Sequence, residues 1–317
     1  MAHLLKAKLS CTLLALLAIT SCNAISDEEG IIASEQYKSI PPNQPVVVNH
    51  LIGPDLLTIT SAPKFAGAIS SLTYRGQEYV NSADHGRLMQ GAIAYNGALE
   101  CLNPTQGGGS RDRNNIGQRS TSQRLRTFVT REDALHVSTR MAYWLRPGTK
   151  CPGVDASGAQ NRAVNSTRLS GDIYEISHSF GLNGRPSVVS LDIKYTIEKA
   201  YVSAVVEALT VYTPLAFNTF HSVNPQTGGL TLEPTVTPDE TNAPVILSTS
   251  DGAHAIAFVS LQAGATYARF RFPDTNKISL VYRDTDGITG LNQYNAAWVI
   301  GTRDEVRVEV ATLLGNR

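Results

Sequence analysis

The sequence predicts an all-β protein in which two large antiparallel sheets pack face to face. Apolar and polar residues alternate along many segments, the pattern of strands with one buried and one solvent-facing side. There are roughly fifteen or more such segments, several of them about ten residues long, which is more than a small immunoglobulin-like sandwich needs. We recognise no capped amphipathic run of helical length after the N-terminal region.

The chain opens with an export signal. A short start carrying Lys6 and Lys8 precedes an apolar stretch that is too short to span a bilayer comfortably. The stretch ends in Ile19-Thr20-Ser21-Cys22, which resembles the lipobox of bacterial lipoproteins. The resemblance implies a signal peptide over residues 1–21 and lipid on Cys22, with an ordinary cleaved signal as the alternative.

By the same resemblance, Asn23 after the lipidated cysteine implies a place in the cell envelope, at the outer membrane if the host has one, facing the periplasm or the surface. Residues 22–45 are polar or interrupted by proline, so we expect a flexible tether. Residues 46–317 then form a single β-sandwich domain, a length that β-domains reach without splitting.

The cysteines fit an exported protein. Of the four cysteines, Cys11 lies in the removed signal peptide and Cys22 carries lipid, so Cys101 and Cys151 remain as an even pair in an oxidising compartment, which is most simply a disulfide. Closing this loop stabilises the fold by roughly 4 kcal/mol on the chain-entropy account. The alternative is a reactive thiol at Cys101, beside Glu100.

Composition excludes some partners. The formal net charge is +0 over the whole chain, with no basic stripe, so we expect no nucleic-acid partner. The Gly107–Gly109 triplet lacks the following Lys-Ser/Thr and helix of a phosphate loop, and Asp284–Gly287 lacks the later Glu of a calcium loop. We therefore expect no cofactor and no metal.

The first strands surround the densest group of polar residues. Ala66–Leu72 and Met89–Tyr95 read as strands, with a turn at Arg75–Glu78 and a polar loop at Asn81–Arg87 between them. The further strand candidates, in chain order, are 46–48, 56–60, 125–130, 134–145, 172–182, 187–197, 201–212, 229–236, 245–250, 254–261, 267–272, 278–282, 296–300 and 305–314.

Two of these segments show the alternation most clearly. Along Ser187–Ile197, every second residue from Val189 is apolar and the residues between are polar. In the last segment, Val306, Val308 and Val310 alternate with charged residues, which predicts a final strand.

The opening stretch also carries a resemblance. Gly67-Ala68-Ile69-Ser70-Ser71-Leu72, then Gly76 and Glu78-Tyr79, resembles the first hairpins of galactose-mutarotase-like supersandwich domains. The resemblance covers only roughly thirty residues and implies this fold more than an activity. The histidine pattern typical of mutarotases is not found at His178, so the resemblance does not imply sugar mutarotation. It leaves open a role in which a grooved sheet processes glycans.

Loop residues are the candidates for chemistry on a glycan. Histidine titrates near neutral pH, and carboxylate, guanidinium and amide groups bind hydroxyls or stabilise charge. The catalytic candidates are His85, Arg87, Glu100 and His221. The candidates for substrate binding are Asp84, Asn103, Arg124 and Tyr294. For each histidine taken singly, a structural or solvent-facing role is the alternative.

Two loop patterns extend this set. Asn103–Gly108 and Asn224–Gly229 share an Asn-Pro turn and paired glycines, so they are candidates to flank one cleft, or are simply turns. The segment Gln106–Arg124 carries four arginines and is either a mobile cover, an anion-binding loop or a plain solvated loop.

These observations favour a lipoprotein, anchored in the membrane through its N-terminal lipid, that binds a polysaccharide or oligosaccharide and cleaves or modifies it by β-elimination or hydrolysis. A non-catalytic glycan- or envelope-binding lipoprotein is the alternative, and a purely structural envelope role is the third hypothesis.

Overall fold

The chain folds almost entirely into antiparallel strands, which confirms the predicted all-β class. The computed structural model describes residues 37–41, 43–109, 120–130, 134–154, 156–233 and 239–315. The predicted signal peptide, Cys22 and most of the tether lie outside the described residues, as do three of the four loop arginines, Arg111, Arg113 and Arg119.

The strands differ widely in length, and the longest run through the middle of the molecule. They are β1 (Tyr37–Ser39), β2 (Val46–Ile52), β3 (Asp55–Ser61), β4 (Ile69–Tyr74), β5 (Gln77–Glu78), β6 (Met89–Tyr95), β7 (Pro104–Thr105), β8 (Gln123–Thr130), β9 (Ala134–Tyr143), β10 (Lys150–Val154), β11 (Gln160–Arg162), β12 (Leu169–Phe180), β13 (Val188–Tyr201), β14 (Ala204–Thr213), β15 (Phe217–Val223), β16 (Leu230–Leu232), β17 (Asp239–Thr241), β18 (Val245–Thr249), β19 (Ala255–Ser260), β20 (Ala265–Arg271), β21 (Asn276–Asp284) and β22 (Ile288–Gly301). Short 3₁₀ turns are η1 (Pro63–Phe65), η2 (Leu99–Leu102) and η3 (Leu182–Gly184), and the helix is α2 (Arg303–Gly315).

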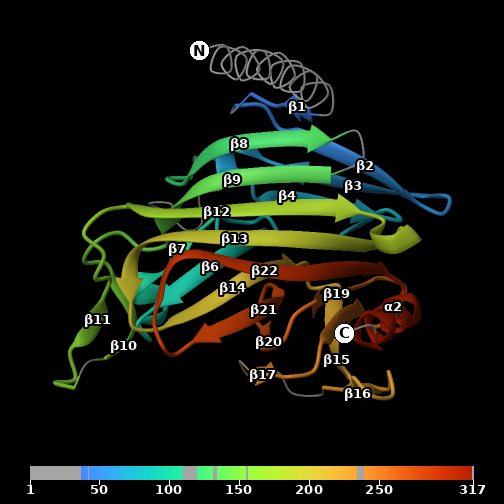
Figure 1. The fold of residues 1–317 in the computed structure, drawn as a ribbon. Coiled ribbons are helices and arrows are strands. Elements are labelled where there is room, and N and C mark those ends of the chain that lie inside the picture. The colour runs from blue at the N-terminus through green and yellow to red at the C-terminus, as the bar shows by residue number, and fades with distance from the viewer. Residues whose placement is uncertain are drawn as a thin grey trace, which may run out of the picture.

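Most strands lie in two layers, which we call the first and the second sheet (Figure 1) and which β7 links into one 20-stranded sheet. Strands β10 and β11 pair apart from them as a two-stranded sheet, and β5 forms a short hairpin with β4. The first sheet has the order β1-β8-β9-β12-β13-β22-β19-β18-β15-β16. The second has the order β2-β3-β4-β6-β14-β21-β20-β17. Short strand β7 pairs with β6 and β9, so it joins the two sheets at one edge.

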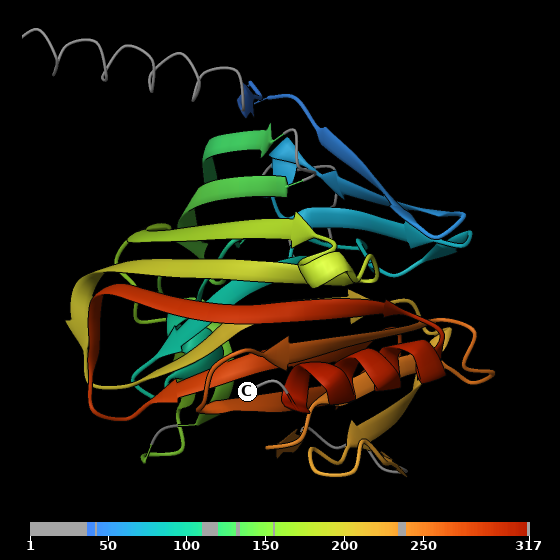
Figure 2. The same cartoon turned by 45° about the vertical axis from the view of Figure 1, so that its right-hand side comes forward.

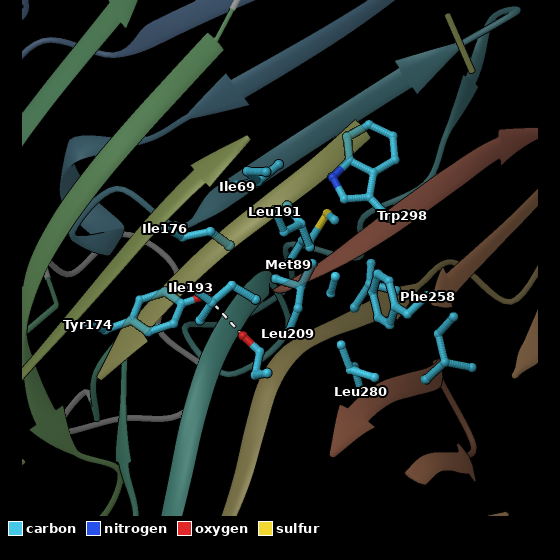
Figure 3. Packing of buried hydrophobic residues seen from close by; sticks show 14 of the residues in the cluster. Ile69, Met89, Tyr174, Ile176, Leu191, Ile193, Leu209, Phe258, Leu280 and Trp298 are labelled. Atoms are coloured by element: carbon cyan, nitrogen blue, oxygen red, sulfur yellow. Dashed lines mark hydrogen bonds between the residues drawn. The ribbon is translucent and has the colours of Figure 1, made fainter. Parts of the chain in front are cut away.

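The core lies between the sheets. Ile69, Met89, Leu209 and Leu280 come from the second sheet and face Leu191, Phe258 and Trp298 from the first (Figure 3). These side chains are almost fully buried, and burial of large apolar side chains is the main favourable term in folding.

Several predicted elements are confirmed closely. The predicted strand Met89–Tyr95 is β6 residue for residue, and the clearest predicted strand is the start of β13. The predicted turn after β4 holds Arg75 and Gly76 at φ 50° and 76°, a left-handed pair suited to a tight hairpin. Within the predicted tether, Tyr37–Ser39 pair with β8 as β1, so the sheet begins before residue 46.

The predicted final strand, Glu305–Leu314, is wrong, because these residues form helix α2. Val306, Val310 and Leu313 are buried at helical spacing and belong to the same apolar cluster as residues of β19 and β22. Figure 2 shows α2 lying across this end of the first sheet. Among the described residues, no helix has the length and apolar character needed to cross a membrane.

The helix also has a start signal that the prediction overlooked. The Thr302 amide donates to Glu305 Oε2 at 2.7 Å, and the Glu305 amide donates to Thr302 Oγ1 at 3.2 Å. This reciprocal pair is a capping box, which satisfies backbone donors that the first helical turn leaves without partners.

Candidate functional site: a charged and aromatic cleft on the second sheet

A cleft of about 580 Å³ lies on the second sheet, on the side away from the core. Alternation along β21 places it there, because Lys277, Val281 and Arg283 line the cleft while Ile278 and Leu280 enter the core. The cleft is lined by Asp84, Gly86, Arg87, Gln90, Ala92, Ile93, Ala94, Leu99, Glu100, Asn103, Thr105, Trp144, Pro152, Val205, Glu207, Thr210, Tyr212, Glu240, Ala268, Phe270, Phe272, Thr275, Lys277, Val281 and Arg283.

A buried ion pair stands at its floor. Lys277 Nζ lies 2.7 and 3.0 Å from the two carboxylate oxygens of Glu207 on β14. Burial lowers the pKa of the ammonium, but the Glu207 carboxylate and Tyr212 together outweigh burial and raise that pKa above its ordinary value. Lys277 is therefore a fixed cation and not a base.

Aromatic rings flank this ammonium on both sides. The strand register sets Lys277 directly opposite Tyr212 on β14 and opposite Phe270 on β20. Its Nζ lies 5.2 Å from the Tyr212 ring centre and 4.8 Å from that of Phe270, within cation–π range. Phe272 extends the row, with its ring nearly parallel to that of Phe270 and 6.0 Å away.

Charged side chains of the loop between β5 and β6 form part of the rim of the cleft. Arg87 donates to Asp274 at 2.5 Å and lies 3.4 Å from Asp84. Asp84 also accepts a hydrogen bond from the Gly86 amide at 2.8 Å. Burial raises the pKa of the Asp84 carboxyl, and the Gly86 and Arg87 contacts only partly oppose this. Asp84 is thus a carboxyl that holds its proton more strongly than an exposed aspartate.

The opposite side of the cleft carries another paired cation. Arg283 on β21 donates through Nε to Glu240 at 2.8 Å, and its Nη2 bonds the other carboxylate oxygen. This pairing lowers the pKa of Glu240, so the carboxylate stays ionised.

The predicted disulfide is confirmed, and it supports one wall of the cleft. Cys101 and Cys151 are bonded with their Cα atoms 5.5 Å apart. Their chain neighbours Glu100 and Pro152 both line the cleft. The bond therefore ties turn η2 to β10 at the point where both face the cleft.

Four of the residues predicted from the sequence meet in this cleft. Asp84 and Arg87 come from the loop before β6, Glu100 from η2, and Asn103 from the segment that leads into β7. Loops at the edge of a sheet gather polar side chains in this way.

The other four predicted residues do not line the cleft. His85 is fully buried, with its ring edge-on to Phe65 at 5.0 Å. His221 is buried on β15, and burial followed by the charge of Arg303 lowers its pKa. The turn Asn224–Gly229, expected to flank the cleft beside Asn103–Gly108, likewise contributes no lining residue.

Arg124 and Tyr294 have other surroundings. Arg124 is buried, and its Nη2 donates to the carbonyls of Pro41 and Gln44 at 2.5 and 2.8 Å, which ties down the segment before β2. Tyr294 stacks on Tyr282 with ring centres 4.4 Å apart. Burial, aided by Asp284 and Tyr282, raises the pKa of Tyr294 to about 12.

The floor residues were not predicted. Lys277, Glu207, Phe270 and Tyr212 lie on regular strands whose polar positions look like an ordinary wet face. The available signal was Phe270 and Phe272 at alternate positions of one strand region, because two aromatics on the solvent side of a strand are unusual.

A smaller hollow of about 290 Å³ lies on the outer face of the first sheet. It is lined by charged and small polar groups, including His136, which is 2.5 Å from Ser177 Oγ. Its lining includes no aromatic ring other than the imidazole. Nowhere in the described part of the chain do three His, Cys, Asp or Glu side chains gather as metal ligands.

Comparison with known proteins found no matching family model and no matching curated protein. Solved structures do resemble the chain. A GH36 α-galactosidase from Geobacillus stearothermophilus aligns with 9% identity and a TM-score of 0.44 over 84% of this chain and 41% of that one. A 4-α-glucanotransferase from Thermococcus litoralis aligns with 11% identity and a TM-score of 0.45 over 84% and 39%.

A GalM/aldose epimerase homologue from C. elegans aligns with 7% identity and a TM-score of 0.37 over 82% of this chain and 99% of that one. The chain spans about two fifths of the length of the galactosidase and glucanotransferase chains. At TM-scores below 0.5, none of these similarities assigns an activity to this chain.

Proposed function

We propose that this protein binds an oligosaccharide, or a segment of a polysaccharide, in the cleft of the second sheet. The observation that carries the proposal is the row of Tyr212, Phe270 and Phe272 beside the paired charges of Lys277 and Glu207. Aromatic rings stack on the apolar faces of sugar rings, while fixed charged groups form strong hydrogen bonds to hydroxyls. A cleft that combines both surfaces suits a molecule that is apolar on its ring faces and polar at its edges.

Modification of the bound glycan is a second candidate function, and one observation favours it. Asp84 lines the cleft, and burial raises the pKa of its carboxyl above the ordinary value, the direction in which buried general acids are tuned. In this role Asp84 would protonate a leaving oxygen. Substitution of Asp84 by Asn then abolishes product formation while leaving retention of the glycan in place.

The binding proposal is tested with the purified full chain on a glycan array, read both for retention and for new reducing or unsaturated ends. Phe272→Ala removes an aromatic platform whose side chain is partly exposed, so we expect binding of a retained glycan to weaken by about 1 kcal/mol, roughly fivefold. Leu51→Ala removes an exposed apolar side chain from β2, outside the cleft, and is the matched control. Equal effects of the two substitutions argue against the cleft, and retention of no glycan overturns the proposal.

We further propose that lipid on Cys22 anchors the protein in the cell envelope, at the outer membrane where the host has one. The support is the sequence Ile19-Thr20-Ser21-Cys22 at the end of the apolar stretch. Labelled palmitate should be incorporated into the full chain and lost in Cys22→Ala. A Cys22→Ala protein that still partitions with membranes contradicts the anchor.

A further inference from the structure

The pairing of the charged side chains in the cleft indicates which net charge a bound ligand should have. Three cations line the cleft, Arg87, Lys277 and Arg283, and each already holds a carboxylate. Lys277 pairs with Glu207, Arg283 with Glu240, and Arg87 with Asp84 and Asp274. Within the described residues, the cleft therefore offers an incoming anion no cation without a carboxylate partner.

The carboxylates outnumber the cations. Even with Asp84 protonated, each of the three cations has a carboxylate partner, Asp274, Glu207 or Glu240, and Glu100 on the cleft wall adds a fourth carboxylate. Glu100 is half-buried on η2, and no cation of the described residues pairs with it. An acidic sugar seated here would meet this extra negative charge in a partly dehydrated space, where repulsion is poorly screened.

To neutralise the charge of an acidic ligand, the cleft would have to take a cation away from its own carboxylate partner. The most central pair is also the most buried, since the Lys277 side chain is 8% exposed. Releasing Lys277 to a ligand carboxylate leaves Glu207 buried without its partner, which is strongly unfavourable. A sugar hydroxyl makes no such demand, because it can donate to a paired carboxylate or accept from a paired cation without separating them.

Resting on the proposed function, we infer that the cleft selects uncharged oligosaccharides and rejects uronate-containing or sulfated ones. The inference bears on the chemistry that this site can support. β-Elimination removes the proton next to the carboxyl carbon of a uronate, whether that carboxyl group is ionised or esterified, and a site that excludes ionised uronates does not perform it on them. For a glycan without uronates, hydrolysis, in which water adds across the glycosidic bond, is the cleavage left of the two considered for this chain.

The test compares matched pairs that differ in charge. The purified full chain is presented with dextran and dextran sulfate, and with fully methyl-esterified and de-esterified oligogalacturonides, at low and at high salt. Because the probes in each pair share one backbone, charge is the main difference between them. We expect at least tenfold weaker binding of the charged member wherever the neutral member binds, with the difference shrinking at high salt.

Two substitutions test the origin of the selection. Glu100→Gln removes the unpaired carboxylate without breaking an ion pair, and Glu207→Gln leaves Lys277 without its carboxylate. Both should raise the relative affinity for the charged probe, Glu207→Gln more strongly. Glu175→Gln, on the outer face of the first sheet, should leave the ratio unchanged.

The outcomes are separable. Tighter binding of the charged probes by the unmodified chain overturns the inference and leaves the proposed glycan binding intact. Unchanged ratios in both Glu100→Gln and Glu207→Gln overturn the charge argument even if the neutral probes bind. Retention of no neutral or charged glycan, on these probes and on the array, overturns the proposed function and this inference with it.

Discussion

At the scale of single residues, some polar side chains of this protein face the cleft and a few others are enclosed by the core. His178 belongs to the second group. It lies between the sheets, where its Nδ1 accepts a hydrogen bond from Trp298 Nε1 at 3.3 Å, and burial lowers its pKa to about 3. The imidazole is therefore neutral in the folded protein, and its contribution depends on pH.

We predict that acid destabilises the protein partly through His178. Its pKa is lowered from 6.5 to about 3 by folding, so between these pH values the unfolded chain binds one more proton than the folded chain. The free energy of unfolding should fall as the pH falls through this window, by up to about 1.4 kcal/mol per pH unit from this group.

The measurement is denaturant unfolding of the wild-type protein and of His178→Gln, which keeps a hydrogen-bond acceptor near Trp298. It is made at several pH values from about 4 to about 7, which cover most of the window between the folded and unfolded pKa values of His178. The dependence on pH should be flatter in the variant, whatever its absolute stability. Parallel curves for the two proteins would show that His178 is not the responsible group.

Residue types in loops were enough to find part of the cleft, and no more. Asp84, Arg87, Glu100 and Asn103 stood out because acidic, basic and amide groups clustered beside turn residues. Lys277 and Glu207 are 70 residues apart and meet only through the β14–β21 pairing. A single strand cannot show which distant strand lies opposite it, so this pair was beyond the sequence.

At the scale of elements, the strands were predictable and the C-terminal helix was not recognised. Period-two alternation revealed β6 and β13, because one side of each strand faces the core. In α2, Val306, Val308 and Val310 imitate that alternation, yet only the first and third are buried. The decisive local signal was Thr302 followed three residues later by Glu305, which favours a helix start.

We predict that Thr302→Ala destabilises the protein by about 1 kcal/mol, because the capping hydrogen bond to the Glu305 amide is lost. Thr312→Ala serves as the comparison, since its hydroxyl bonds the Val308 carbonyl within the same helix and caps nothing. Thermal and denaturant unfolding should separate the two variants. Equal stability of Thr302→Ala and the wild-type protein would mean that the capping box contributes little.

At the scale of the whole molecule, the disulfide links stability to the shape of the cleft. It closes a separation of 50 residues and joins two lining segments. We predict that the Cys101→Ser, Cys151→Ser double variant loses up to about 4 kcal/mol of stability, chiefly because its unfolded chain is less constrained. Denaturant unfolding with and without a reducing agent measures this loss, and the reducing agent should leave the double variant unaffected.

The same variant should also bind glycan more weakly than the wild-type protein under conditions where both are folded, because η2 is no longer tied to β10. Unchanged affinity would show that the wall keeps its shape without the bond.

The fold class could be predicted because the alternation of apolar and polar residues, and the number of segments that show it, can be read directly from the order of residues in the sequence. The hollow on the second sheet could not, since its depth depends on how η2, the Asp84–Arg87 loop and Trp144 rise around the strands. Those positions are set by contacts between distant segments, such as the disulfide and the Arg87–Asp274 ion pair.

The most direct test of the central claim is a crystal structure of the full chain with a neutral oligosaccharide that it retains. We predict the sugar rings over Tyr212, Phe270 and Phe272, with hydroxyls bonded to Glu207 or Lys277 and the ion pair between them intact. A glycan seated elsewhere, for example in the hollow beside His136 and Ser177 on the first sheet, would contradict the claim that the cleft is the binding site.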